Sequence, residues 1–219
     1  MWLAYDAYNN VDFERICSEG KDQACRIVEQ INTFIGPQHN PLSVLEWGCG
    51  PGRVIQHLPR LLGGRARLFA TDYNSKTVAW CKSSIAGISF AENSLAPPLP
   101  FEDSTMDAVY SISVFTHLSE AMHFAWIKEL ERVLKPGGLL LVTMHGNLSC
   151  HSLTQAELKV FRDGDLVVRA NVKEGSRLYA TFHPDQFVST QLLANFEMLR
   201  KVEPFAPFMR QTLWVARKS

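Results

Sequence analysis

The stretch Val-Leu-Glu-Trp-Gly-Cys-Gly-Pro-Gly-Arg-Val, residues 44–54, decides the fold class of this chain. An apolar strand pattern runs into the acidic Glu46. Three glycines follow at alternate positions, Gly48, Gly50 and Gly52, and an amphipathic stretch comes after them. Glycine has no Cβ, so a ligand can approach the backbone of such a turn, and a helix N-terminus beyond it offers unpaired N–H groups. This arrangement is typical of a nucleotide-type cofactor site at the first turn of an open α/β sheet.

The glycine spacing distinguishes between classes of cofactor. The dinucleotide fingerprint G-x-G-x-x-G needs its third glycine at position 53, where this chain has Arg53. A phosphate-binding P-loop needs Lys-Ser or Lys-Thr after its glycines, and neither follows here. Glu46 would repel a pyrophosphate in a low-dielectric site, whereas it suits a ligand with an ammonium or sulfonium group. The spacing therefore disfavours a nucleotide-dependent oxidoreductase.

Four blocks of sequence together resemble one family. Glu-Trp-Gly-Cys-Gly-Pro-Gly at residues 46–52 resembles motif I, [DE]-x-G-x-G-x-G, of the class I S-adenosylmethionine-dependent methyltransferases. Three further blocks are similar to that family in order and spacing, and they lie at residues 70–74, 98–111 and 130–140. A glycine-rich turn alone could be a tight turn without a ligand. The four ordered blocks favour a cofactor site.

The resemblance implies a Rossmann-like fold, which is an α/β sheet of seven mostly parallel strands with helices on both faces. Its strand order would be 3-2-1-4-5-7-6, with the last strand antiparallel. Strands and helices alternate along the chain, which independently predicts a parallel sheet with right-handed crossovers. We expect one domain over residues 1–219. Predicted strands lie at 66–71, 88–91, 106–112, 139–144, 196–202 and 210–217, and predicted helices at 75–86, 119–134 and 186–195. The stretch after the glycines is predicted to be a helix that ends at Gly63-Gly64.

The pattern changes after the fifth strand. Asp163-Gly164-Asp165 lies between apolar runs at 158–162 and 166–171, which is a hairpin signal. A second turn at 173–176 precedes a short strand at 178–182. We interpret residues 147–182 as a small β-hairpin insertion that covers the substrate side, because ligands lie beyond the carboxyl ends of such strands. A hairpin that merely extends the sheet is the alternative.

An amphipathic arm precedes the first strand, and residues 1–36 are predicted to be helical. Tyr5 and Tyr8 in this arm would be able to close over the cofactor, as N-terminal helices often do in the family that the chain resembles. Core packing of the two tyrosines explains their positions equally well.

The resemblance also implies which residues bind S-adenosylmethionine. Glu46, Gly48 and Gly50 would contact its methionine moiety. Asp72 with Tyr73 would bind the ribose and adenine, although Asp72 is also a good N-cap for the next helix. The family usually has Asp where this chain has Asn93, the residue expected at the adenine edge. The full set of candidate cofactor-binding residues is Glu46, Gly48, Cys49, Gly50, Gly52, Asp72, Tyr73, Asn93, Ser111 and His117.

A hydroxyl or amine acceptor would need a general base, and histidine titrates in the useful range. Candidate histidines follow predicted strand ends. His145 is the first choice because it ends the predicted fifth strand, and His183 before Pro184 is the second. For His117 we favour packing at the start of a helix over catalysis. Some members of such families need no protein base.

Composition excludes several function classes. Lys plus Arg equals Asp plus Glu at 22 each, and no basic run appears, which disfavours nucleic acid or an anionic membrane as partner. Five scattered cysteines form neither a disulfide framework nor a zinc motif. No leader or apolar span is evident, so we expect a cytoplasmic protein. We also expect a monomer or homodimer, and no bound metal.

The sequence thus predicts an S-adenosylmethionine-dependent methyltransferase for a small molecule: a metabolite, a sugar or a natural-product intermediate. Transfer would be an in-line displacement that leaves S-adenosylhomocysteine. A non-catalytic S-adenosylmethionine-binding module with a regulatory or assembly role is the alternative. No residue pattern distinguishes O-, N- or C-methylation.

Overall fold

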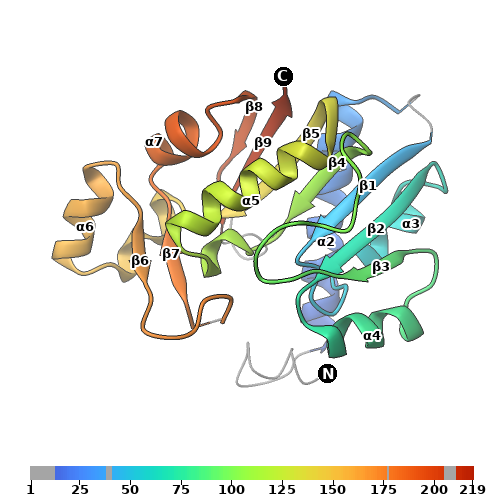
Figure 1. Ribbon diagram of the computed structural model, residues 1–219, viewed down its shortest axis with the longest axis horizontal. Coiled ribbons are helices and arrows are strands. Elements are labelled where there is room, and N and C mark those ends of the chain that lie inside the picture. The colour runs from blue at the N-terminus through green and yellow to red at the C-terminus, as the bar shows by residue number, and fades with distance from the viewer. Residues whose placement is uncertain (1–12, 38–40, 177, 205–210) are drawn as a thin grey trace.

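The computed structural model describes residues 13–37, 41–176, 178–204 and 211–219. Its main sheet has seven strands in the order β3-β2-β1-β4-β5-β9-β8, with helices on both faces (Figure 1). The strands are β1 (Leu42–Trp47), β2 (Ala66–Asp72), β3 (Ser89–Glu92), β4 (Met106–Ser111), β5 (Leu134–Met144), β8 (Phe196–Val202) and β9 (Thr212–Lys218). The helical segments are α2 (Phe13–Phe34), η1 (Ile55–His57), α3 (Leu58–Leu61), α4 (Ser75–Ser84), η2 (Phe115–His117), α5 (Glu120–Val133), η3 (Asn147–Ser152), α6 (Gln155–Arg162), α7 (Asp185–Phe187) and η4 (Val188–Leu192).

The strand order and directions confirm the predicted Rossmann-like topology. β1 pairs in parallel with β2 on one side and β4 on the other, and β5 pairs in parallel with β4. β9 runs antiparallel to β5 and to β8. The carboxyl ends of the parallel strands therefore meet at one edge of the sheet. The chain order reverses between β1 and β4, which is where ligands bind in open α/β sheets.

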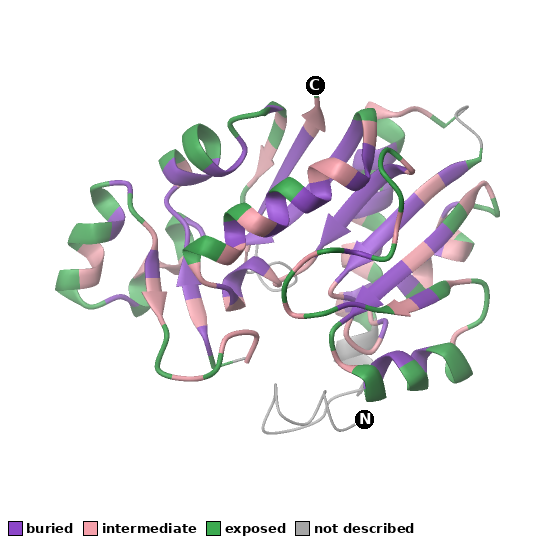
Figure 2. Ribbon diagram, viewed as in Figure 1, coloured by how far each residue is buried: buried purple, intermediate pink, exposed green. Residues whose placement is uncertain are grey.

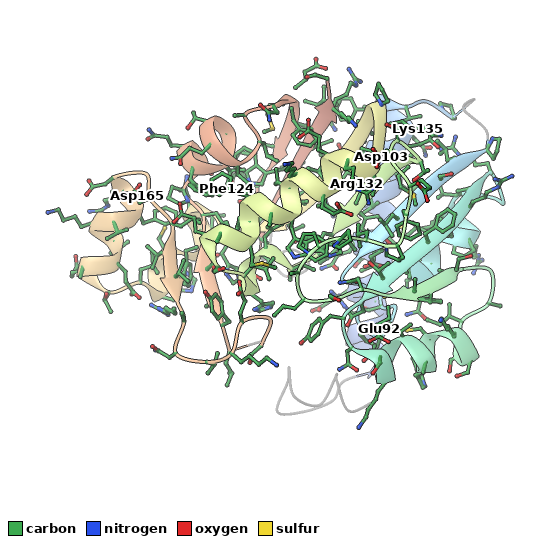
Figure 3. The ribbon with its side chains drawn as sticks, viewed as in Figure 1. Glu92, Asp103, Phe124, Arg132, Lys135 and Asp165 are labelled. Atoms are coloured by element: carbon green, nitrogen blue, oxygen red, sulfur yellow. The ribbon has the colours of Figure 1, made fainter. Side chains whose placement is uncertain are left out.

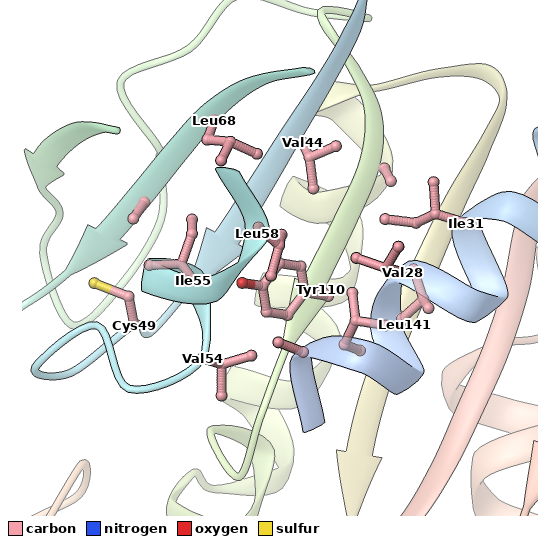
Figure 4. Close-up of a cluster of buried hydrophobic side chains, with 14 of the residues drawn as sticks. Val28, Ile31, Val44, Cys49, Val54, Ile55, Leu58, Leu68, Tyr110 and Leu141 are labelled. Carbon is pink, nitrogen blue, oxygen red and sulfur yellow. The ribbon is translucent and has the colours of Figure 1, made fainter. Parts of the chain in front are cut away.

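Alternate residues of β1 supply two cores. Val44 faces a cluster built with α2, η1, α3 and α4, part of which Figure 4 shows. Leu45 faces a second cluster built with α5 and the α7–η4 segment. Both faces of the central strands are thus buried, as Figure 2 shows. Burial on two sides explains the four consecutive apolar residues of β5, Leu139–Val142, which face the two clusters in turn.

The proline-rich loop between β3 and β4 is anchored to α5. Glu129 Oε1 accepts a hydrogen bond from Leu99 N at 2.6 Å. Arg132 Nη1 lies 2.6 Å from Asp103 Oδ1, and Figure 3 shows these two side chains pointing toward each other. These contacts fix the end of the loop that leads into β4, at the amino-terminal end of that strand.

Two predictions about local structure differ from what the structure contains. The stretch after the glycines is shorter than a full helix: it is the 3-10 turn η1 followed by the single turn α3. Pro59 is the second residue of α3. It has no N–H group, so it cannot donate the backbone hydrogen bond that would continue a helix from η1 into α3. Gly63 and Gly64, both at positive φ, then end the segment.

The predicted hairpin around Asp163-Gly164-Asp165 is wrong. Residues 158–162 belong to α6, which begins with a capping box between Thr154 and Glu157 and ends before Gly164 at φ +95°. An antiparallel pair does occur in the insertion, between β6 (Val167–Arg169) and β7 (Ala180–Phe182). The reason is that Thr154 and Glu157 favour the start of a helix. The glycine turn at Gly164 is compatible with the end of that helix as well as with a hairpin.

None of the described helices is both long and apolar enough to span a membrane. Tyr5 and Tyr8 lie outside the described residues.

Candidate functional site

The glycine loop is held by the end of β2. The N–H groups of Gly48 and Cys49 both donate to Thr71 O, at 2.8 and 2.9 Å. Gly48 has φ +75°, and a Cβ added there would lie 2.2 Å from Val114 Cγ2. Gly48 is therefore required both by its backbone conformation and by the close approach of the segment after β4.

Gly50 is the open position of the loop. It has φ +51°, and a Cβ built on it would meet no heavy atom within 4 Å. Its N–H donates to Asp72 Oδ2 at 2.8 Å. Gly52 is different, because an added Cβ there would lie 2.5 Å from Ile85 Cδ1. Of these two glycines, Gly50 leaves backbone that a ligand can approach.

Asp72 organises the loop rather than the helix that follows it. Its Oδ1 accepts from Asn74 N at 2.8 Å, while Oδ2 is the acceptor for Gly50. Asn74, not Asp72, is the N-cap of α4, and its side chain accepts from Thr77 N. Asp72 therefore does not fill its alternative role as N-cap of this helix, because Asn74 lies directly before the first helical residue.

Asn93 carries an unsatisfied acceptor next to Asp72. Its N–H donates to Asp72 O at 3.1 Å, and its Nδ2 donates to Ser94 O at 2.6 Å. Its Oδ1 is buried and has no hydrogen-bond partner among the described residues. An unpaired buried acceptor costs about 1–3 kcal/mol, so a donor on a ligand would be stabilised here. The Ser111 Oγ at the end of β4 is buried without a described partner in the same way.

Glu46 lies beneath the glycine loop. It is 2% exposed, and its Oε2 accepts from Tyr110 Oη at 2.9 Å and from Ile55 N at 3.1 Å. Burial raises the pKa of this carboxyl from 4.5 to about 8. Glu46 thus carries a proton at neutral pH in the ligand-free protein, and a cation beside it would favour loss of that proton.

Cys49 does not provide a nucleophile. Its thiol and that of Cys81 each lie 3.5 Å from Gly50 O. The hydrogen bond with Cys81 and burial both raise the pKa of the Cys49 thiol. The group stays protonated and packs in the core.

Tyr73 and His117 connect this site to the insertion. Tyr73, which is half exposed, donates from its hydroxyl to Gly175 O at 3.1 Å. His117 ends η2; its O accepts from Gly175 N at 2.9 Å, and its Nδ1 lies 2.8 Å from Tyr179 O. The turn predicted at 173–176 therefore lies against two of the predicted cofactor-binding residues.

The two histidines proposed as bases differ in their surroundings. His145 is half-buried, with Nδ1 3.2 Å from Thr181 O and its ring against Phe182. Burial lowers its pKa, so the ring is neutral at neutral pH. His183 is 1% exposed, and its Nε2 lies 2.8 Å from Nε2 of His123. The structure therefore brings His145, but not His183, to a partly accessible position at the end of β5.

Sequence reasoning missed His123. It is fully buried on α5, with Nδ1 2.7 Å from Ser119 O, and burial lowers its pKa to about 4. Helical spacing with Trp126 and Leu130 indicated a buried face, but a pattern along one helix holds no information about a partner sixty residues away.

Comparisons with known proteins agree with this geometry. A family model described as a methyltransferase domain matches residues 44–138. A fatty-acid O-methyltransferase of Mycolicibacterium smegmatis is 36% identical over 102 residues, which is 46% of this chain and 36% of that protein. A tRNA N(3)-methylcytidine methyltransferase of Schizosaccharomyces pombe is 28% identical over 149 residues, 63% of this chain and 46% of that protein. The chain thus spans less than half the length of these curated relatives.

Solved structures share the fold. Magnesium protoporphyrin IX methyltransferase from Synechocystis, solved with bound S-adenosylhomocysteine, superposes with a TM-score of 0.65 at 18% identity, over 100% of this chain and 93% of that one. A SAM-dependent methyltransferase from Methanosarcina mazei gives 0.64 at 19% identity, over 86% and 96%. The family model covers the same strands and loops that meet around Gly50, Asp72 and Asn93. Residues 44–138 therefore match the methyltransferase-domain family, and the described fold is the one found in solved S-adenosylmethionine-dependent methyltransferases.

Proposed function

We propose that this protein transfers the methyl group of S-adenosylmethionine to a small molecule. One observation carries the proposal: the open backbone of Gly50 after β1 and the unpaired buried oxygen of Asn93 after β3 lie on either side of Asp72, which ends β2 between them. A ligand that lies along these three residues needs a polar group at one end, against the backbone of Gly50. At its other end it needs a hydrogen-bond donor for Asn93 Oδ1. The chemistry of an adenosine-containing cofactor fits both needs.

The residues that would hold the cofactor divide by chemistry. Gly48 and Gly50 would face the methionine part, and Glu46 would balance its ammonium from beneath the loop. Asp72 would accept from the ribose hydroxyls, Tyr73 would lie along the adenine, and Asn93 Oδ1 would accept from its amino group. When bound, S-adenosylmethionine supplies a methyl group on a cationic sulfur. The sulfur is the leaving group and keeps the electron pair of the C–S bond. The protein then contributes mainly alignment, which can be worth several kcal/mol.

The insertion supports a small acceptor. Gly175 contacts both Tyr73 and His117, so residues 173–176 lie across the edge of the sheet between the ends of β2 and β4. A segment tied down on both sides leaves less room for a macromolecule than an open edge does. The sequence also has a net charge of zero and no run of basic residues that would attract nucleic acid. The insertion lies outside the family match at 44–138, so the acceptors named for relatives do not transfer to this chain.

His145 is our candidate for the proton acceptor. It follows β5, whose neighbour β4 borders β1 and its glycine loop. A neutral imidazole there can take a proton from a hydroxyl or amine as the new bond forms, and solvent can then remove the proton. His183 is too deeply buried for direct contact with an acceptor.

Cofactor binding is tested first. S-Adenosylhomocysteine should raise the melting temperature because it binds only the folded state, whereas NAD should not. Unchanged melting at millimolar S-adenosylhomocysteine would refute the proposal.

The acceptor is tested with S-adenosylmethionine that carries a labelled methyl group. We expect label in the small-molecule fraction of a cell extract and none in bulk tRNA or protein. Label in tRNA alone would exclude a small acceptor. Cofactor binding without transfer to any fraction would support the non-catalytic alternative instead.

A further inference from the structure

The short strand β7 and the residue just before it supply backbone acceptors to two histidines at the edge of the main sheet. Tyr179 O lies 2.8 Å from His117 Nδ1, and Thr181 O lies 3.2 Å from His145 Nδ1. Residues two apart in an extended segment direct their carbonyls to the same side. One strand edge therefore contacts both imidazoles.

These contacts determine where the proton of His145 lies. A carbonyl oxygen only accepts hydrogen bonds, so Nδ1 of His145 must carry the hydrogen. Burial lowers its pKa, and a neutral imidazole protonated on Nδ1 has its lone pair on Nε2. None of the described residues donates a hydrogen bond to this Nε2. Nε2 is thus the basic nitrogen.

Thr181 anchors the strand that makes this contact. It is fully buried, and its Oγ1 donates to Leu118 O, just before α5, at 2.7 Å. Its hydroxyl therefore holds β7 to the main domain, while its own carbonyl lies against His145.

A second anchor lies two residues further along. His123 Nδ1 lies 2.7 Å from Ser119 O, so this nitrogen carries the hydrogen and its Nε2 accepts. His183 must then donate from Nε2 across the 2.8 Å contact. Both rings are buried, so this bond is shielded from water and ties the end of β7 to α5.

We propose that Thr181 is a positioning residue: its hydrogen bond to Leu118 holds β7 so that the Thr181 carbonyl keeps His145 protonated on Nδ1 and leaves Nε2 as the proton acceptor. This role rests on the proposed methyl transfer. In that reaction the proton of the acceptor's O–H or N–H bond moves to Nε2, and the imidazolium returns it to solvent.

The tautomer can be read directly by long-range ¹H–¹⁵N correlation on protein with ¹⁵N-labelled histidine at neutral pH. His145→Gln assigns the His145 signals by their loss. We expect a protonated, pyrrole-type Nδ1 and a pyridine-type Nε2 in the wild-type protein. Thr181→Val keeps the side-chain volume but removes the hydroxyl that donates to Leu118 O. It should shift the ¹⁵N signal of His145 Nε2 toward the value of a protonated, pyrrole-type nitrogen. Thr181→Ser should restore the wild-type spectrum.

Thr190→Val is the matched control, because the exposed Thr190 hydroxyl donates to Gln186 O in the same helical segment and to no other described residue. It should leave His145 unchanged. A wild-type His145 protonated on Nε2, or a Thr181→Val spectrum identical to wild type, would overturn the proposal. If the valine variant does not fold, Thr181→Ala serves in its place with the same expected shift.

Failure of the proposed function gives a different signature. S-Adenosylhomocysteine would then not stabilise the wild-type protein, whatever the tautomer of His145. A wrong tautomer with normal stabilisation by S-adenosylhomocysteine refutes only the role of Thr181.

Discussion

The glycine-loop edge and the insertion are built in different ways. In the loop, backbone groups and Asp72 meet across two adjacent parallel strands, and glycines permit the close approach. In the insertion, residues 173–183 are tied to the main domain by side chains of Tyr73, Thr181 and His183. The glycine-loop edge thus depends on strand order and local conformation, whereas the insertion depends on particular long-range pairs.

The largest effect is expected from Gly48→Ala. The positive φ costs about 1–2 kcal/mol, and the contact with Val114 adds a further 1–3 kcal/mol or so. We expect the free energy of unfolding in urea to fall by this sum. Gly63→Ala is the control, because Gly63 also has positive φ but an added Cβ meets nothing within 4 Å. Equal losses in the two variants would show that the loop does not depend on close packing.

A pH effect of intermediate size is expected from Glu46. Its pKa of about 8 in the folded protein lies above the ordinary value of 4.5 for a glutamate, so the folded protein holds the proton more tightly. This contribution to stability is complete below about pH 4.5 and is lost as pH rises through about 8, at roughly 1 kcal/mol per pH unit or less. Denaturation at pH 5 and pH 8 should show the fall in the wild type and a flatter profile in Glu46→Gln.

Glu46 also gives a test of its predicted contact with the cofactor. Binding of an ammonium nearby should release a proton at pH 7, which calorimetry in buffers of different ionisation enthalpy detects. If S-adenosylhomocysteine binds without proton release, Glu46 serves the loop alone.

Asp72→Ala should weaken binding of S-adenosylhomocysteine by about 2 kcal/mol, or roughly thirtyfold in Kd, because both the loop and the ribose lose their acceptor. Titration calorimetry measures this. Asn74→Ala removes the N-cap of α4 and should reduce stability without changing Kd. A Kd that Asp72→Ala leaves unaltered would remove Asp72 from the cofactor site.

The smallest effect is expected in the insertion. Thr154→Ala removes one half of the capping box and should destabilise α6 by about 1 kcal/mol. Hydrogen exchange should accelerate within residues 155–162, while the Kd for S-adenosylhomocysteine stays the same. A change in that Kd would mean that the two regions are coupled through α6.

Much of the glycine-loop edge could be predicted because its signals are short in range. Motif I, Asp72 and the alternating strands lie in order along the chain, and the parallel topology follows from that order. The capping box at Thr154 and Glu157 was also readable, although the turn signal at Gly164 led to the wrong element. Both are local patterns, and the hairpin prediction rested on the turn signal alone.

The sequence by itself determined the fold class, the glycine loop and the residues that surround Gly50. Only the tertiary structure decided that Glu46 lies beneath the loop against Tyr110, that His183 pairs with His123, and that Thr181 contacts His145. The physical reason is range. Glycine conformations and strand order follow from neighbouring residues, but a buried hydrogen bond between residues 36 to 64 positions apart exists only once the sheet and the insertion have packed.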